Sequence, residues 1–299
     1  MKNWLLVISL AILTTCGLPG QSSKTERSET IKKEFTVNNS ESSKLYIRNI
    51  SGGFDIQGYE GNQIILEIKK TVKVRRETEM EKAWAENELG IVQRGDAILL
   101  YHKTPCSNEN ISTVNPDDWS EWNQLYKNNC RWDSDYEDTK FDYVIKVPNQ
   151  ILLNVSTVND GDIIVKNTKG ELNANNVNGA ITLENIGNAR KVHTINGDVK
   201  LIFSQNPSID AHYYTLNGDI NAYLKKGLSS NLYFESFNGD FYTDIEDSVI
   251  EPLPLKVEKA KESKGVAFKV GGKTGIKVRN GGPKLEFETF NGNVYIKEQ

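Results

Sequence analysis

The chain has 299 residues, 37% of them hydrophobic, which is enough for one large or two medium domains with a real core. Lys and Arg number 36 against 40 Asp and Glu, and the resulting net charge of -4 is spread without long blocks. A nucleic-acid binder needs a basic patch, so nucleic acid is not expected as a partner.

The N-terminus has the pattern of an export signal. Lys2 is followed by an almost unbroken apolar run from Trp4 to Leu13, and Cys16 comes soon after. The run is too short to span a bilayer as a stable helix. We therefore expect the mature chain to lie outside the cytoplasm.

The segment that ends at Cys16 also resembles a bacterial lipobox, in which the Cys becomes the lipidated first residue. Thr15 departs from that pattern, because Gly, Ala or Ser normally precedes the Cys. We expect a lipoprotein-type signal peptide over 1–16, a polar tether over 17–31, and a lipid on Cys16 that holds the chain to the membrane. The alternative is an ordinary secretory peptide that is cleaved off with Cys16. With lipidation the chain would be an outer-membrane or cell-surface lipoprotein of a bacterial envelope.

Export also changes how the other two cysteines are interpreted. An oxidising compartment favours pairing of Cys106 with Cys130 over two free thiols. This disulfide would close a loop of roughly 25 residues and, by lowering the entropy of the unfolded chain, would stabilise the fold by about 3 kcal/mol. Two cysteines do not support a thiolate zinc site, and we predict neither a metal nor a cofactor.

Residues 32–148 read as an N-terminal β region. Short strands are expected at 44–48, 54–56, 64–68, 91–101 and 141–147, because these segments are β-branched or alternate in polarity between glycine-rich breaks. The segment 77–89 lacks β-branched residues apart from Thr78 and is predicted to be the one helix. A polar, aromatic insertion with both cysteines occupies 104–139.

From 149 to 299 the chain is periodic. A corner of the form Thr-hydrophobic-Asn-Gly-Asp-hydrophobic recurs, with its glycine at 161, 179, 197, 218, 239 and 292, in steps of 18, 18, 21, 21 and 53. The last step contains an excursion over 247–282. The turn residues are Asn178, Gly179, Asn196, Gly197, Asn217, Gly218, Asn238, Gly239, Asn291 and Gly292.

This period predicts an all-β, parallel β-solenoid of β-helix type with about 18 to 21 residues per coil. Both corner residues are expected to have positive φ, which Gly adopts freely and Asn tolerates. A meander of hairpins with type I′ turns is the structural alternative. In 198–203, Val199, Leu201 and Phe203 should face the core while the residues between them face outwards.

The corner motif, preceded by strands such as 142–148, resembles a bacterial family of β-solenoid envelope proteins named as adhesins and without a characterised function. The resemblance extends back to 45–56 and so covers most of the mature chain. It implies a β-solenoid at the cell envelope, and the family has no defined catalytic or ligand residues to carry over. The cysteine-bearing insertion and the 53-residue step depart from the pattern.

The insertion offers the best candidate recognition residues. Trp119, Trp122 and Trp132 lie within or beside the loop between the two cysteines, and planar aromatics on such a loop can stack on sugar rings or anchor a protein. The alternative is that they cover an open end or edge of the fold.

Other chemistry is less favoured. Asp162, Asp198, Asp219 and Asp240 share one corner position, which suggests capping of turns in preference to a calcium ladder. The acids of 133–138 lack the glycine and terminal Glu of a calcium loop. The histidines at 102, 193 and 212 are isolated in the sequence, and no nucleophile motif occurs.

These patterns favour a non-enzymatic protein that acts as a binding, adhesin-like or structural module. Its expected partners are the membrane, through the N-terminal lipid, and a glycan or an envelope or surface protein. The alternative is a carbohydrate-active β-helix enzyme acting on polysaccharide, which would need a pair of acids within about 10 Å in a groove.

Overall fold

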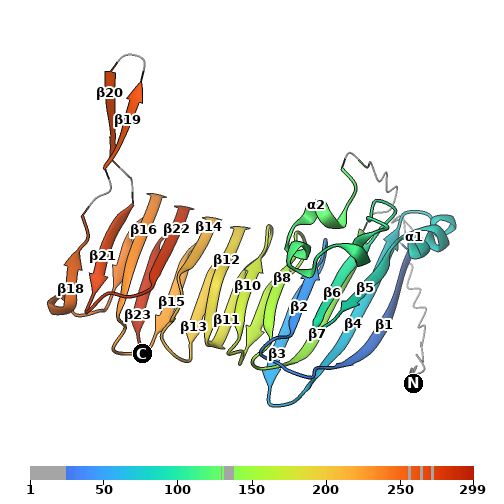
Figure 1. Cartoon of the computed structure of the whole chain (residues 1–299). Helices are drawn as coiled ribbons and strands as arrows, with labels where there is room; N and C mark the ends of the chain where they lie inside the picture. Colours follow the sequence, from blue (N-terminus) through green and yellow to red (C-terminus); the bar gives the residue numbers. More distant parts are fainter. Residues whose placement is uncertain (1–24, 129, 131–137, 255–256, 263–264, 271–272) are drawn as a thin grey trace, which may run out of the picture. The chain divides into compact units, whose positions relative to one another are not determined.

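The computed structural model describes residues 25–128, 130, 138–254, 257–262, 265–270 and 273–299, and Cys16 lies outside them. The protein is all-β with a few short helices, and its sheets are mixed (Figure 1). It forms two compact units, one that extends through Gly170 and one from Glu171 to Gln299. No helix among the described residues is long and apolar enough to cross a membrane.

Unit 1 contains two sheets with strands in the orders β1-β4-β7-β3-β9 and β8-β2-β6-β5. Neighbouring strands are parallel except where β4 meets β1 and β7 and where β5 meets β6. The strands are β1 (Thr25–Thr36), β2 (Lys44–Arg48), β3 (Phe54–Tyr59), β4 (Gln63–Val74), β5 (Glu88–Arg94), β6 (Ala97–Lys103), β7 (Asp138–Pro148), β8 (Leu152–Ser156) and β9 (Ile163–Lys166). The helical segments are η1 (Glu77–Glu79), α1 (Met80–Glu86), η2 (Ile111–Thr113), η3 (Pro116–Ser120) and α2 (Trp122–Leu125).

Unit 2 contains strands in the orders β11-β13-β15-β23-β17 and β10-β12-β14-β22-β16-β21-β18, with β19 and β20 as a separate antiparallel pair. Neighbouring strands in these two sheets are parallel except where β21 meets β16 and β18. The elements are β10 (Glu171–Asn175), β11 (Ile181–Ile186), β12 (Asn188–Asn196), β13 (Val199–Phe203), β14 (Ala211–Asn217), β15 (Ile220–Leu224), β16 (Ser230–Asn238), β17 (Phe241–Thr243), η4 (Asp247–Val249), β18 (Ile250–Pro252), β19 (Val257–Glu262), β20 (Gly265–Val270), β21 (Thr274–Val278), β22 (Lys284–Asn291) and β23 (Val294–Glu298).

Alternation along the strands places the core of unit 2. In β13 the side chains of Val199, Leu201 and Phe203 are buried while those between them are partly exposed, as predicted. The same alternation holds in β11, β15 and β23. Each fully buried aliphatic side chain contributes about 1.5–3 kcal/mol, so the inward faces of these strands are the main source of stability.

Copies of the corner motif are not arranged in space in their chain order. β22, from the last copy, lies between β14 and β16, and β23 lies between β15 and β17. The final copy is therefore inserted between the copies at 215–220 and 236–241. The excursion before it includes β18 and β21, which pair beyond β16 at the edge of the sheet.

The corner backbone differs from the prediction of positive φ at both residues. The non-Gly residues with positive φ in the described chain are Asp160, Asn167, Asn185 and Arg279, and none is an Asn of an Asn-Gly corner. Glycine is required because the turns lie directly on one another. A Cβ on Gly197 would lie 2.3 Å from the carbonyl oxygen of Gly179, a contact that no side chain can make.

The polar members of the motif link each corner to the next. The buried hydroxyl of Thr194 donates to the carbonyl of Gly179 at 2.8 Å, and Thr215 donates in the same way to Gly197. The carboxylate of Asp198 accepts the backbone N–H of Asp219 at 2.8 Å. The acidic corner position thus caps the turn of a neighbouring copy, which satisfies backbone groups that would otherwise be left without a partner.

Three predictions of element bounds were wrong. The tether predicted over 17–31 becomes β1 from Thr25 onwards, a polar edge strand paired along its length with β4; residues 17–24 lie outside the described part. The helix predicted to Leu89 ends at Glu86, because Asn87 is extended and its side chain caps the carbonyl of Ala83 at 2.8 Å. The single strand predicted over 91–101 is a hairpin that turns at Gly95, whose φ is +58°.

Candidate functional site

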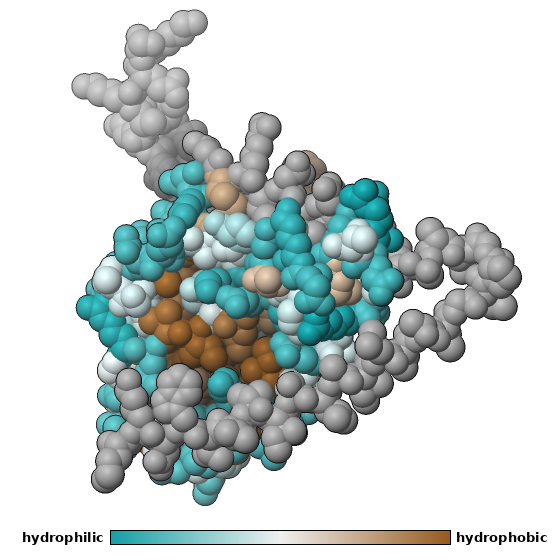
Figure 2. Space-filling view, turned by 90° about the vertical axis from the view of Figure 1, so that its right-hand side faces the viewer, coloured by the Kyte–Doolittle hydropathy of each residue, from teal (hydrophilic) through white to brown (hydrophobic). Residues whose placement is uncertain are grey.

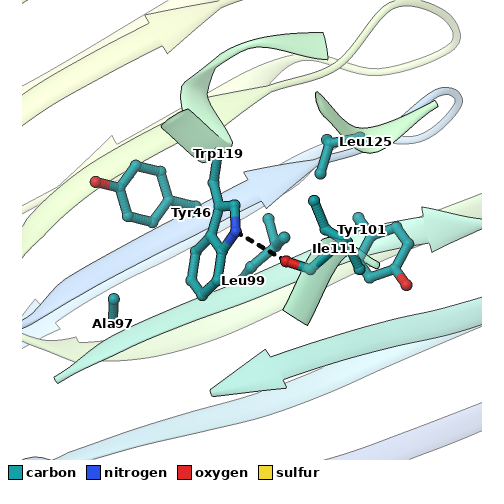
Figure 3. Close-up of a cluster of buried hydrophobic side chains, with 7 residues drawn as sticks. All are labelled: Tyr46, Ala97, Leu99, Tyr101, Ile111, Trp119 and Leu125. Carbon is teal, nitrogen blue, oxygen red and sulfur yellow. Dashed lines mark hydrogen bonds between the residues drawn. The ribbon is translucent and has the colours of Figure 1, made fainter. Parts of the chain in front are cut away.

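Trp119 is a core residue of the insertion and is fully buried. It packs edge-to-face on Tyr46, with ring centroids 5.9 Å apart, and its indole N–H donates to the carbonyl of Ile111 at 3.3 Å (Figure 3). The insertion covers the outer face of β2 and β6, which explains why β6 reads as a continuous hydrophobic run. Trp119 therefore covers a sheet, which agrees with the alternative that the tryptophans of the insertion cover part of the fold.

Of the other two tryptophans, the structure describes only Trp122. Trp122 is half-buried and stacks on Tyr126 at 5.7 Å, and the Tyr126 hydroxyl donates to the carbonyl of His102. Trp132 lies outside the described residues. The structure contains the predicted disulfide between Cys106 and Cys130, whose Cα atoms are 5.6 Å apart.

The hydrophobic residue directly before the Asn in each corner of unit 2 points outwards. In their spatial order these residues form a row at the end of the outer face of one sheet, which we call the corner stripe: Val177, Ile195, Leu216, Phe290 and Phe237. Their side chains change from Val to Phe along the row. At a strand spacing of about 4.8 Å the row is roughly 19 Å long.

The aromatic end of the corner stripe is its most exposed part. Phe237 is 74% exposed and Phe290 is 44% exposed, and their rings stack with centroids 4.8 Å apart and planes 5° apart. Across the turn, Tyr242 and Tyr295 form a second stacked pair at 5.1 Å. Exposed aromatic pairs of this kind contribute little to a core and are typical of contact surfaces.

An amide ladder runs beside the corner stripe. The side chains of Asn196, Asn217, Asn291 and Asn238 each donate to the Asn before them in space, starting at Asn178, at 2.8–2.9 Å. One N–H of each of these four side chains is used in the ladder, so each keeps a second N–H, and the amides are exposed. The corner of unit 2 therefore presents a hydrophobic row and a hydrogen-bonding row side by side.

The sequence contained the signal for the corner stripe. Every copy of the corner has a hydrophobic residue before its Asn, and the residue is Phe at 237 and 290. The motif was interpreted only as turn chemistry, whereas hydrogen bonding explains its Thr, Asn, Gly and Asp but not its hydrophobic member. Two histidines that are far apart in the sequence, His193 and His212, also lie side by side in the structure.

His193 and His212 lie on the neighbouring strands β12 and β14, with Nε2 of His193 3.0 Å from Nδ1 of His212. Nε2 of His212 lies 3.2 Å from the carboxylate of Glu288. The carboxylate can only accept, so Nε2 of His212 donates to it. Burial, then the neighbouring His212 and Lys191, lowers the pKa of His193 to about 3, which keeps it neutral.

The acids of this face are engaged with cations. Lys273 lies 3.3 Å from both Glu286 and Glu288. Partial burial acts to raise the pKa of Glu286, but Lys284 and Lys273 outweigh it and lower that pKa overall. A glycosidase acid needs a raised pKa, so this cluster is not favoured as one. In the described part of the chain no three His, Cys, Asp or Glu side chains gather as metal ligands.

The buried His102 of unit 1 predicts a pH dependence of stability. Its Nε2–H donates to Asn87 at 2.7 Å, and burial, then the nearby Lys70, lowers its pKa to about 4. The unfolded chain binds the proton near pH 6.5, so stability is full above that value and falls as the pH drops towards 4. Urea unfolding should show that the free energy of unfolding falls by on the order of 2 kcal/mol between about pH 7 and 4.5. In the variant His102→Gln this decrease should be absent. An identical pH profile in the variant would contradict this assignment.

Residues 154–245 match the family described as Toastrack DUF4097. No curated protein matches the chain. Solved structures do match: a Clostridium sporogenes protein provisionally named for cell adhesion has 13% identity and a TM-score of 0.43, with 91% of this chain and 100% of that chain covered. A Bacteroides fragilis protein provisionally named an adhesin has 10% identity, 90% and 97% coverage and a TM-score of 0.33. A Parabacteroides distasonis protein provisionally named for lipid binding has 9% identity, the same coverage and a TM-score of 0.27.

Proposed function

We propose that this chain is an exported, non-catalytic binding module of the bacterial cell envelope, anchored through a lipid on Cys16, which binds an extended partner along the corner stripe. Its repeats form the coils of a β-solenoid, with the last coil inserted out of chain order. The observation that carries the proposal is the outward Phe237–Phe290 pair, which stays exposed although every polar member of the same motif has a partner within the fold.

The chemistry of the corner stripe favours a glycan chain. Sugar rings have apolar faces that can lie against Leu216, Phe290 and Phe237, and their hydroxyls can pair with the amides of the ladder beside them. A straight row roughly 19 Å long suits an extended polymer better than a small compact ligand. A protein surface is the second class of partner that such a row can accept.

The test is binding of the purified mature chain to a glycan array and to envelope fractions, compared with a Phe237→Ser, Phe290→Ser double variant. We expect the double variant to lose at least about tenfold in affinity, since two exposed aromatic contacts are removed. Val144→Ser is the matched control, because Val144 is 55% exposed on β7 of unit 1, outside the corner stripe.

The outcomes separate the hypotheses. If the double variant loses glycan binding and Val144→Ser does not, the proposal is supported. If the double variant loses binding to envelope protein fractions but not to glycans, the partner is a protein. Unchanged binding in the double variant overturns the role of the corner stripe. If Cys16→Ala abolishes function in cells while the double variant is silent, the chain is an anchored scaffold instead.

A further inference from the structure

Unit 1 has an open cleft at the end where its two sheets finish in the edge strands β1 and β5, which we call the end cleft. Its volume is about 610 Å³, and α1 lies at one side of it. Figure 2 shows the side of the molecule on which these elements lie, with a hydrophobic area surrounded by hydrophilic residues. A cleft of this size falls in the range of small-molecule sites.

The lining of the end cleft is hydrophobic on both strands. Ile31 comes from β1, and Leu89 and Ile91 come from β5. All three are only partly buried, although they face the interior between the sheets. They form an apolar surface that the chain itself leaves open to solvent.

A lysine occupies an unusual position in this cleft. Lys70 continues the inward row of β4 after Ile68, where the other side chains are apolar, and it is only 3% exposed. Its ammonium group donates to the carbonyl of Trp84 at 2.9 Å and lies 3.8 Å from the centroid of the Trp84 ring. Among the described residues it makes no ion pair.

A buried charge without an ion pair is costly, and proteins normally provide it with a counter-ion. Glu29 and Glu88 lie close enough to favour the charged form without forming an ion pair with Lys70. Glu88 is instead paired with Lys103 at 2.7 Å. Lys33, which lines the same cleft from β1, adds a second cation. The polar part of the end cleft therefore has a place for one further anionic group.

We propose that the end cleft binds a single-chain amphiphile with a carboxylate headgroup, its carboxylate at Lys70 and Lys33 and its hydrocarbon chain along Ile31, Leu89 and Ile91. A small free anion would leave the apolar lining uncovered, and a neutral apolar ligand would leave the ammonium of Lys70 unmatched. An amphiphile satisfies both, since it covers the lining and supplies a charge-assisted hydrogen bond.

The pKa of Lys70 gives the site a pH dependence. Burial, with a smaller contribution from Arg27, outweighs the nearby Glu29 and Glu88 and lowers this pKa to about 8. The ammonium group is then charged at neutral pH and loses its charge in mildly alkaline solution. Binding of a carboxylate should weaken as the pH rises from 7 to about 9.5.

The experiment titrates the full mature chain with a fluorescent long-chain fatty acid and displaces the probe with oleate. We expect Lys70→Met to weaken binding at least about tenfold, because a buried charge-assisted hydrogen bond is lost. Lys69→Met is the matched control, since Lys69 is adjacent in β4 and exposed on the opposite face. Ile91→Ser should also weaken binding, because Ile91 would contact the hydrocarbon chain of the fatty acid and not its carboxylate.

Three outcomes would overturn the proposal. Methyl oleate displacing the probe as well as oleate would remove the role of the carboxylate, and inorganic phosphate displacing it would indicate a simple anion site. Equal affinities for Lys70→Met and Lys69→Met would remove the role of Lys70. Circular dichroism of each variant shows that a loss does not come from unfolding, and the result is independent of whether the corner stripe binds a glycan.

Discussion

Gly197→Ala is expected to destabilise the protein by about 3 kcal/mol or more. The new methyl group would lie 2.3 Å from the carbonyl oxygen and 2.8 Å from the next backbone nitrogen of the adjacent turn, so main chain must move. Gly197 lies between two other turns and hydrogen-bonds to one of them through its backbone N–H, which limits that movement. Urea unfolding monitored by circular dichroism measures the effect.

Gly227→Ala is the control for the steric explanation. A Cβ there meets no atom within 4 Å, but φ is +84°, so only conformational strain of about 1 kcal/mol is expected. If the two variants lose the same stability, close stacking of the turns does not explain the repeated glycine.

Trp119→Ala is expected to cost about 3–5 kcal/mol, the range for removing a large aromatic side chain from a packed core. The variant also loses the hydrogen bond to Ile111 and the edge-to-face contact with Tyr46. Denaturant unfolding measures the loss, and hydrogen exchange in β6 shows whether the insertion opens separately from the sheet beneath it.

Trp122→Ala provides the comparison. Trp122 is half-buried, so removing its side chain should lower the free energy of unfolding by only on the order of 1 kcal/mol. The interpretation of Trp119 as a covering residue predicts that neither variant changes glycan binding, once the remaining folded fraction is taken into account. Normal stability of Trp119→Ala together with lost binding would restore Trp119 as a recognition residue.

Much of unit 2 could be predicted because its repeat reflects a local requirement, the close approach of one turn to the next, which needs glycine. The Asn-Gly spacing located the turns and the alternation in 198–203 located the core. The insertion of the last copy between two earlier ones could not be predicted. The motif around Asn291 fits against Asn217 as well as against Asn238, and it contacts both, so equivalent corners do not specify their order.

The strands at the edges of unit 1 were harder to predict for a different reason. β1 is held by pairing along its whole length with β4, while its side chains are mostly polar, so it reads as a tether. Its hydrophobic members, Ile31 and Phe35, are too few to give a strong period. Edge strands carry such polar sequences because they must avoid pairing with other chains.

The candidate sites were missed because aromatic residues were sought where they are dense in sequence. The insertion is rich in tryptophan, yet Trp119 is there to cover β2 and β6. Phe237 and Phe290 are 53 positions apart and meet only because the last copy is inserted beside the copy at 236–241. Nothing in the sequence separates Lys70 from the exposed lysines, since only the register of β4 places it inside.

Photo-crosslinking in living cells tests directly whether the corner stripe contacts an envelope glycan. A benzophenone amino acid would be placed at Phe237, at Phe290, or at the exposed Val144 of unit 1 as a control. We expect covalent adducts with an envelope glycan from positions 237 and 290 and none from 144. Absence of adducts from the corner stripe, or equal adducts at all three positions, would contradict it.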